Sequence, residues 1–195
     1  MKMPPLLVLT DRAQCTRPLI DIVTEAVEAG ARAVVLREKD LSEGRRTELA
    51  EHLRTVLAPV GGVLIIAGAR GARGAAVHLS ASDAFPSLPP SWVGRSCHDA
   101  AEVRAAGEEG CDYVTLSPVF ATASKPGYGP ALGVHGLAAL TAIATSPVYA
   151  LGGVDPPDVA DCLAAGASGI AVMGPVMRTP QLVAAYLAAL QQAAS

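Results

Sequence analysis

Eight short apolar runs recur along this chain of 195 residues, and each ends in a polar or glycine-containing turn. Their apolar character is continuous rather than alternating, which is typical of strands buried on both faces, as in a parallel sheet with helices outside it. This feature constrains the fold more than any other. The expected strands are residues 6–10, 33–36, 63–66, 76–79, 93–97, 113–116, 148–151 and 169–173.

The segments between these runs carry apolar residues at three- and four-residue steps, which predicts amphipathic helices. Two strand-to-strand connections are abbreviated. Residues 67–75 leave room for only about two helical turns, and three prolines (Pro86, Pro89 and Pro90) leave little helix between the fourth and fifth strands. The expected helices are residues 19–29, 43–57, 100–106, 136–145, 157–165 and 180–193.

A weak internal repeat supports the same architecture. Segments 25–36, 102–116 and 158–172 share one plan, in which an amphipathic helix is followed by Ala-Gly and then by a strand. The glycine permits the left-handed residue that ends a helix. Such units either close into a barrel or open into a doubly wound sheet. Eight strand candidates, and no G-x-G-x-x-G after the first, favour a single-domain (β/α)₈ TIM barrel over residues 1–195.

Composition narrows the class of protein. The chain is 51% hydrophobic and 17% charged, which argues against disorder, and its formal net charge of -3 gives no reason to expect nucleic acid or an anionic membrane as a partner. The longest apolar stretches fall far short of the ~20 residues that span a bilayer, and no leader precedes the first, so we expect a cytoplasmic protein. The four cysteines lack C-x-x-C spacing and predict free thiols; Cys97, beside His98, is the one placed for reactivity.

Residues directly after the strands of such a barrel gather at one mouth, where this fold places its active sites. Arg37 and Lys39 lie two apart, so along an extended strand end they point the same way, with Glu38 opposite. Two cations directed into a mouth suit a pyrophosphate or a carboxylate. The alternative is a solvated turn in which Glu38 and Asp40 neutralise both cations.

Glycines follow the last two strands. Backbone N–H groups at Gly152-Gly153 and at Met173-Gly174 could converge on one anion with no side chain in the way, and a phosphate site after strands seven and eight is common in this fold. The alternative is that these glycines serve tight turns only. Lys125, in a Ser-Lys-Pro-Gly loop, is a candidate to close over a substrate phosphate.

His98 is the best-placed general acid or base, because its ordinary pKa lies near neutral and it follows a strand end. A surface histidine that opens a helix is the alternative. His78 is expected to be a packed strand residue. Asp83 and Asp11 could hold Mg²⁺ through a phosphate, although Asp83 also suits a helix N-cap, which we favour.

The chain resembles the thiamine phosphate synthase and TenI superfamily along nearly its whole length. Six pieces in order carry the resemblance: VLTDR (8–12), LREKDL (36–41), AVHL (76–79), SPVF with TASK (117–120 and 122–125), LGGV (151–154) and GIAVM (169–173). The resemblance implies a TIM barrel, a role in thiamine biosynthesis and a thiazole phosphate as ligand.

Departures from the family pattern bear on which activity to expect. Synthases place an Asn-Asp pair after the third strand. The aspartate of this pair holds Mg²⁺ together with a second aspartate, which is matched here by Asp83. At the position of the pair, this chain has Ala67-Gly68. Synthases also often have Gln where Val35 stands. Residues 94–98 look like those of TenI-type tautomerases, which need no metal. The histidine implicated as base in one branch of that group is matched by Ser117, so we take His98 as the candidate base instead.

The resulting expectation is a TenI-like thiazole tautomerase that works by proton transfer. A thiamine phosphate synthase, which couples pyrimidine pyrophosphate to thiazole phosphate, is the alternative, as is a non-catalytic binder of thiamine intermediates. No cofactor is expected, and Mg²⁺ at Asp83 only for a synthase; the oligomeric state stays open, a homodimer included. The expected catalytic residues are His98, Ser117 and Lys39, and the expected ligand-binding residues are Arg37, Lys39, Thr122, Ser124, Lys125, Gly152, Gly153, Met173 and Gly174.

Overall fold

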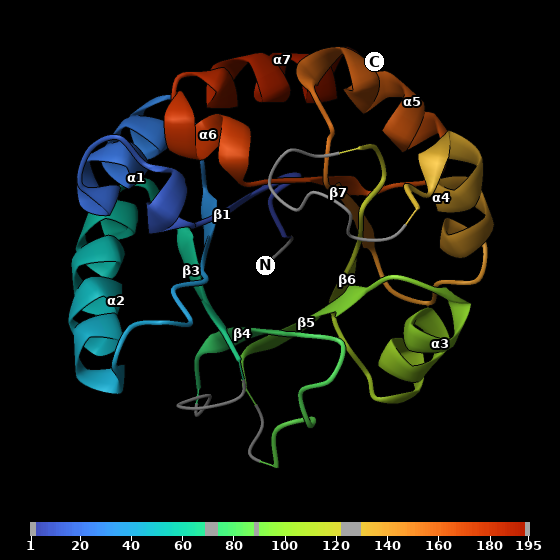
Figure 1. Ribbon diagram of the computed structural model, residues 1–195, viewed down its shortest axis with the longest axis horizontal. Helices are drawn as coiled ribbons and strands as arrows, with labels where there is room; N and C mark the ends of the chain where they lie inside the picture. The colour runs from blue at the N-terminus through green and yellow to red at the C-terminus, as the bar shows by residue number, and fades with distance from the viewer. Residues whose placement is uncertain (1–2, 69–73, 88–89, 122–129, 194–195) are drawn as a thin grey trace.

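Parallel pairing joins each strand to the next along the chain and the last strand back to the first, which closes an eight-stranded barrel (Figure 1). The structure, a computed structural model, describes residues 3–68, 74–87, 90–121 and 130–193. The predicted TIM-barrel class is confirmed, and each strand lies within a residue of its expected bounds. The strands are β1 (Leu6–Leu9), β2 (Ala33–Leu36), β3 (Val63–Ala67), β4 (Ala76–Leu79), β5 (Trp92–Cys97), β6 (Tyr113–Leu116), β7 (Val148–Leu151) and β8 (Gly169–Val172).

The helices surround the barrel on its outside (Figure 1). They are α1 (Leu19–Glu28), α2 (Glu43–Leu57), α3 (Ala100–Glu108), α4 (Gly133–Thr141), α5 (Val159–Ala164), α6 (Gly174–Arg178) and α7 (Leu182–Ala193), with short 3₁₀ turns η1 (Arg12–Gln14), η2 (Ala58–Val60) and η3 (Pro156–Asp158). Within the described residues, no helix follows β3 or β4, where we expected abbreviated helical segments. No helix in this part of the chain is long and apolar enough to cross a bilayer.

Two helix assignments differ from expectation. Helix α4 begins one turn earlier than residue 136, and α6 occupies a segment that is not among the expected helices. The repeat holds in two of its three copies, where Gly30 and Gly166 adopt φ of 115° and 92° at the helix end. In the middle copy α3 continues through Gly107, and the left-handed residue is Gly110 instead.

The buried side chains form two layers, because successive strand residues face opposite sides of the barrel wall. The outer layer packs strands against helices. The inner layer fills the barrel with aliphatic residues and two tyrosines, and Tyr113 and Tyr149 meet edge to face. The buried residues of the inner layer are Leu7, Leu9, Ala33, Val35, Ile65, Ala67, Ala76, Tyr113, Tyr149 and Ala171.

Gly94 on β5 is the residue that makes room for the Tyr113 ring. A Cβ built on Gly94 would lie 2.0 Å from Cζ of Tyr113, and the ring is buried on all sides. We therefore expect Gly94→Ala to lower the free energy of unfolding by about 2–3 kcal/mol through overpacking, measured by urea denaturation. The matched control is Gly44→Ala on α2, where a Cβ meets nothing within 4 Å. An unchanged midpoint for Gly94→Ala would contradict the assignment.

Candidate functional site

A cavity of about 620 Å³ opens at the carboxyl ends of the barrel strands. Its apolar floor comes from the inner layer, including Leu9, Ala67 and Ala171. Polar side chains and glycine turns surround this floor. The volume falls within the range of small-molecule sites. The expected site residues that line it are Arg37, Lys39, His98, Ser117, Gly152, Gly153, Met173 and Gly174.

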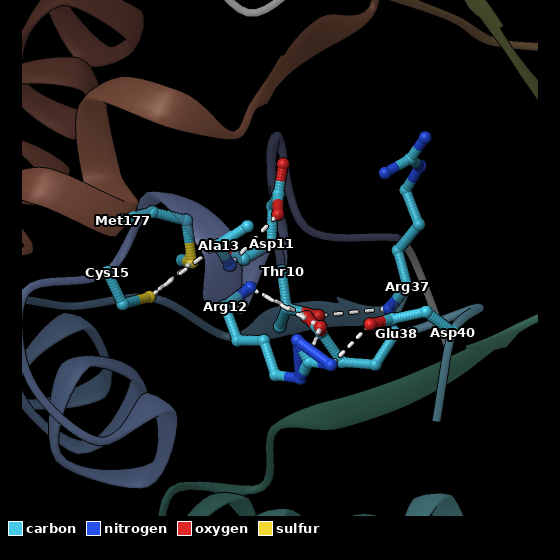
Figure 2. Close-up of polar contacts among 9 residues, drawn as sticks. All are labelled: Thr10, Asp11, Arg12, Ala13, Cys15, Arg37, Glu38, Asp40 and Met177. Carbon is cyan, nitrogen blue, oxygen red and sulfur yellow. Dashed lines mark hydrogen bonds and ion pairs between the residues drawn. The ribbon is translucent and has the colours of Figure 1, made fainter. Parts of the chain in front are cut away.

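Arg37 and Lys39 both line the cavity, and the carboxylates beside them in sequence are engaged elsewhere (Figure 2). Glu38 is buried and accepts the backbone N–H of Arg12 at 3.1 Å, with the Nε of Arg12 at 3.8 Å. Asp40 pairs with the guanidinium of the same arginine. Among the described residues, no carboxylate lies within ion-pair distance of Arg37 or Lys39. Neutralisation of these two cations by Glu38 and Asp40 is therefore not what the structure shows.

Two residues after β1, Thr10 and Asp11, hold the backbone beside the cations in place. Thr10 is fully buried, and its hydroxyl accepts the backbone N–H of Arg37 at 2.9 Å, which ties the end of β1 to the end of β2 (Figure 2). Asp11 accepts the backbone N–H of Ala13 at 3.2 Å and caps the η1 turn. Asp11 does not line the cavity, so its carboxylate is structural in this arrangement.

The two glycine turns reach the same cavity. Gly152 and Gly153 have φ of 91° and 69°, conformations that glycine adopts without strain. Within the described part of the chain, the N–H groups of Gly152, Gly153 and Gly174 donate to no acceptor. The arrangement can therefore receive an anion on backbone amides.

His98 and Ser117 meet at the carboxyl ends of β5 and β6. The Nδ1 of His98 lies 2.7 Å from the carbonyl oxygen of Ser117 and 3.3 Å from its hydroxyl. Since a carbonyl can only accept, Nδ1 carries the proton, and in the neutral ring the lone pair is on Nε2. The backbone N–H of His98 donates to Glu102 at 2.6 Å. This geometry suits a histidine that accepts or returns a proton through Nε2.

His78 is buried as predicted, but it also reaches the cavity, which the sequence interpretation missed. Its ring lies between the hydroxyls of Tyr113 and Ser96, at 3.0 and 2.9 Å. Burial lowers its pKa to about 4, helped by the positive charges of Lys39 and Arg37. Strand alternation puts His78 on the same face as Ala76, and the structure shows that this face is the interior one.

Arg178 is a second residue that the sequence analysis did not select. It ends α6, lines the cavity, and donates through Nη1 to Gln14 at 2.8 Å. Its signal in the sequence is its position four residues after Gly174, one helical turn beyond the last glycine site. It adds a third cation to the mouth.

The described donors do not fit a metal site held by the protein. Asp83 does not line the cavity, and its carboxylate accepts the backbone N–H of Ser80 at 2.7 Å, which closes a turn rather than capping a helix as we expected. Burial alone raises the pKa of Asp83, but the hydrogen bonds from Ser80 and the positive charges of Lys39 and Arg95 together outweigh it, and the pKa lies below its usual value. No group of three His, Cys, Asp or Glu side chains that could hold a metal occurs among the described residues.

Arg95, although it lies on β5 next to the cavity-lining Ser96, does not line the cavity. Its Nη1 donates to the carbonyl oxygens of Ser80, Ala81 and Asp83 at 2.9–3.2 Å, and its Nη2 lies 2.7 Å from Glu109. It fixes the turn after β4. The loop residues Thr122, Ser124 and Lys125 lie outside the described residues.

Cys97 is fully buried on the outer face of β5, and burial raises the pKa of its thiol to about 12, aided by the negative charge of Glu102. A thiol with a raised pKa stays protonated at neutral pH and is a poor nucleophile. We expect no labelling of Cys97 by iodoacetamide in the folded protein at pH 8, and full labelling in urea, as measured by mass spectrometry. The half-exposed Cys15 provides the internal comparison. Rapid labelling of folded protein at Cys97 would contradict its burial.

Comparison with known proteins agrees with this geometry. The family model described as thiamine monophosphate synthase matches residues 6–176. A thiamine-phosphate synthase of Methanoculleus marisnigri is 36% identical over 177 residues, which cover 85% of this chain and 83% of that protein. One of Moorella thermoacetica is 30% identical over 188 residues, with 91% and 90% covered.

Among solved structures, the thiamine phosphate pyrophosphorylase from Pyrococcus furiosus superposes with a TM-score of 0.81 at 24% identity, covering 97% of this chain and 96% of that one, which supports the fold. The names of these relatives are those of synthases, so the tautomerase preference drawn from the sequence gains no support from them. The match over nearly the whole chain shows that this protein belongs to the thiamine monophosphate synthase family.

Proposed function

We propose that this protein is a thiamine phosphate synthase, which couples a pyrimidine pyrophosphate to a thiazole phosphate. The observation that carries the proposal is that one cavity is lined by two separate groups that are able to receive an anion. Arg37 and Lys39 come from the turn after β2, and the amides of Gly153 and Gly174 come from the turns after β7 and β8. A coupling reaction brings two anionic substrates together, and these two groups could receive one substrate each.

The residues divide between the two substrates in this proposal. The glycine turns hold the phosphate of the thiazole on backbone amides. Arg37, Lys39 and Arg178 neutralise the pyrophosphate as its bond to the pyrimidine breaks and the bond to the thiazole ring forms, because preorganised cations stabilise charge that develops in the transition state. Thr122, Ser124 and Lys125 remain predicted phosphate contacts.

A tautomerase is the second candidate, and a specific observation favours it. Ala67 lines the cavity at the end of β3, where the resemblance to synthases leads us to expect an Asn-Asp pair. Segments 69–73 and 122–129 contain no Asp or Glu that could replace it. Proton transfer by His98 through Nε2 requires no such group. Ser117 would hold the ring by its carbonyl, and Lys39 would bind the carboxylate of the thiazole.

One assay separates the candidates. Purified protein with both substrates, with Mg²⁺ and with a chelator, is followed for release of pyrophosphate, and with the carboxylated thiazole alone for isomerisation. A synthase releases pyrophosphate only when both substrates are present. Isomerisation without pyrophosphate release would overturn the proposal in favour of the tautomerase. Binding of thiazole phosphate with neither reaction would establish a non-catalytic binder.

A further inference from the structure

A buried chain of three polar side chains lies beneath the cavity. The Nδ1 of His78 is 3.0 Å from the hydroxyl oxygen of Tyr113, and its Nε2 is 2.9 Å from the hydroxyl of Ser96. His78 and Ser96 line the cavity, whereas Tyr113 is buried below it and stacks on the histidine ring, with centroids 5.5 Å apart. The mechanism proposed above gives these three hydrogen-bonded side chains no role.

His78 is neutral at the pH of most cells. Burial lowers its pKa to about 4, and the positive charges of Lys39, Arg37 and Arg95 that face it outweigh the negative charge of Asp83. A neutral imidazole has one N–H and one lone pair. The ring proton of His78 is therefore on either Nδ1 or Nε2. With the proton on Nδ1, the Ser96 hydroxyl donates to Nε2; with the proton on Nε2, the Ser96 hydroxyl accepts from it.

Tyr113 decides between the two. Among the described residues, the only hydrogen-bond partner of its hydroxyl is Nδ1 of His78. If Nδ1 carried the proton, the phenol oxygen could only accept, and its own buried O–H would lack an acceptor, at a cost of about 1–3 kcal/mol. The phenol therefore donates to Nδ1, Nε2–H donates to Ser96, and the hydrogen of the Ser96 hydroxyl is left for the cavity.

We propose that Tyr113 and His78 are positioning residues that fix the hydroxyl of Ser96 as a hydrogen-bond donor toward the cavity, where it selects an anionic oxygen of the ligand. The choice of an anionic oxygen rests on the proposed function. The orientation of the hydroxyl rests only on the buried geometry. A hydroxyl fixed as a donor discriminates against a ligand that presents a donor at the same point, because one of two facing donors loses its hydrogen bond.

The orientation is tested on the unmodified protein. ¹⁵N-labelled protein is examined by long-range ¹H–¹⁵N correlation spectroscopy at neutral pH, which distinguishes protonated from unprotonated ring nitrogens. His78 is expected to have a protonated Nε2 and an unprotonated Nδ1. A protonated Nδ1 would overturn the proposal without reference to activity.

A double-mutant cycle tests the consequence, with inorganic pyrophosphate as the probe in calorimetry. Ser96→Ala and Tyr113→Phe are each expected to weaken binding by about five- to ten-fold, the usual effect of one hydrogen bond. The double variant is expected to bind no more weakly than Ser96→Ala, because Tyr113 acts through Ser96. Full additivity would show a merely structural role for Tyr113 and would overturn the proposal.

Tyr149→Phe is the matched control for this cycle. It removes a phenol hydroxyl from the same interior layer, but that hydroxyl donates to the carbonyl oxygen of Pro4, away from the cavity. It is expected to leave pyrophosphate binding unchanged, and an equal loss would refute a specific path through His78. If the wild-type protein bound neither pyrophosphate nor thiazole phosphate, the proposed function would be refuted, and so would the donation from Ser96 to an anionic oxygen of the ligand. The spectroscopic experiment would still decide how the Ser96 hydroxyl is oriented.

Discussion

Replacing Gly153 by alanine is expected to lower the free energy of unfolding by about 3 kcal/mol and to weaken thiazole phosphate binding by at least about ten-fold. A Cβ at this position would lie 2.5 Å from the carbonyl oxygen of Ala121 and 2.7 Å from that of Phe120. Both are backbone atoms and can yield only if the turn after β6 moves. The residue also has a φ of 69°, which costs any L side chain about 1–2 kcal/mol, and the clash adds about as much again.

The loss of binding has a separate cause from the loss of stability. If the turn after β7 moves to relieve the clash, its N–H groups no longer meet those of Gly174 at one point, and displacements of about 1 Å are enough to reduce catalysis strongly. Gly110→Ala is the control, because Gly110 has a φ of 79° but a Cβ there meets nothing within 4 Å. It is expected to cost about 1 kcal/mol without affecting binding. Equal effects of the two substitutions would contradict the close approach.

Arg37→Gln and Lys39→Gln are expected to raise the KM for pyrimidine pyrophosphate by about ten- to a hundred-fold each, the range for one hydrogen bond to a charged group. Their neighbouring carboxylates are held by Arg12, so each cation presents its charge to the cavity. Because Arg37 is only half-buried and Lys39 is exposed, the free energy of unfolding is expected to change little. Steady-state kinetics and urea denaturation measure the two quantities.

Arg45→Gln supplies the matched control, since it removes the same charge from an exposed position on α2. Its KM is expected to equal that of the wild type, and the wild-type KM to rise with salt concentration as the anion is screened. If Arg45→Gln had the same effect as Arg37→Gln, the overall charge of the protein rather than these two residues would govern binding.

The barrel could be predicted from the sequence because its strands are buried on both faces, which leaves unbroken apolar runs that are visible along a single chain. The same property hides which face each residue takes. On β5, Arg95 faces outward to the turn after β4, while Ser96 faces the cavity. Nothing in a continuous apolar run shows which face a given residue takes, so the sequence does not separate Arg95 from Ser96.

The location of residues at the strand ends, unlike that of residues within the strands, could be predicted from the sequence. Arg37, Lys39, His98 and the glycine turns were selected because every parallel strand of a closed barrel ends at the same rim, and the structure brings them to one cavity. Their partners were beyond reach of the sequence, because the contacts join distant segments. Glu38 is held by a residue 26 positions earlier in the chain, and His98 by one 19 positions later.

The sequence by itself determined the number, order and approximate bounds of the strands, the closure of the barrel and the rim at which its chemistry gathers, because these follow from local hydrophobic patterning and from the rule for parallel connections. Only the tertiary structure decided which charges are available. Arg12 engages Glu38 and Asp40 (Figure 2). Arg37 and Lys39 are thereby left to the cavity, and His78 joins Tyr113 to Ser96. Such pairings depend on distances between separate strands, which no local pattern encodes.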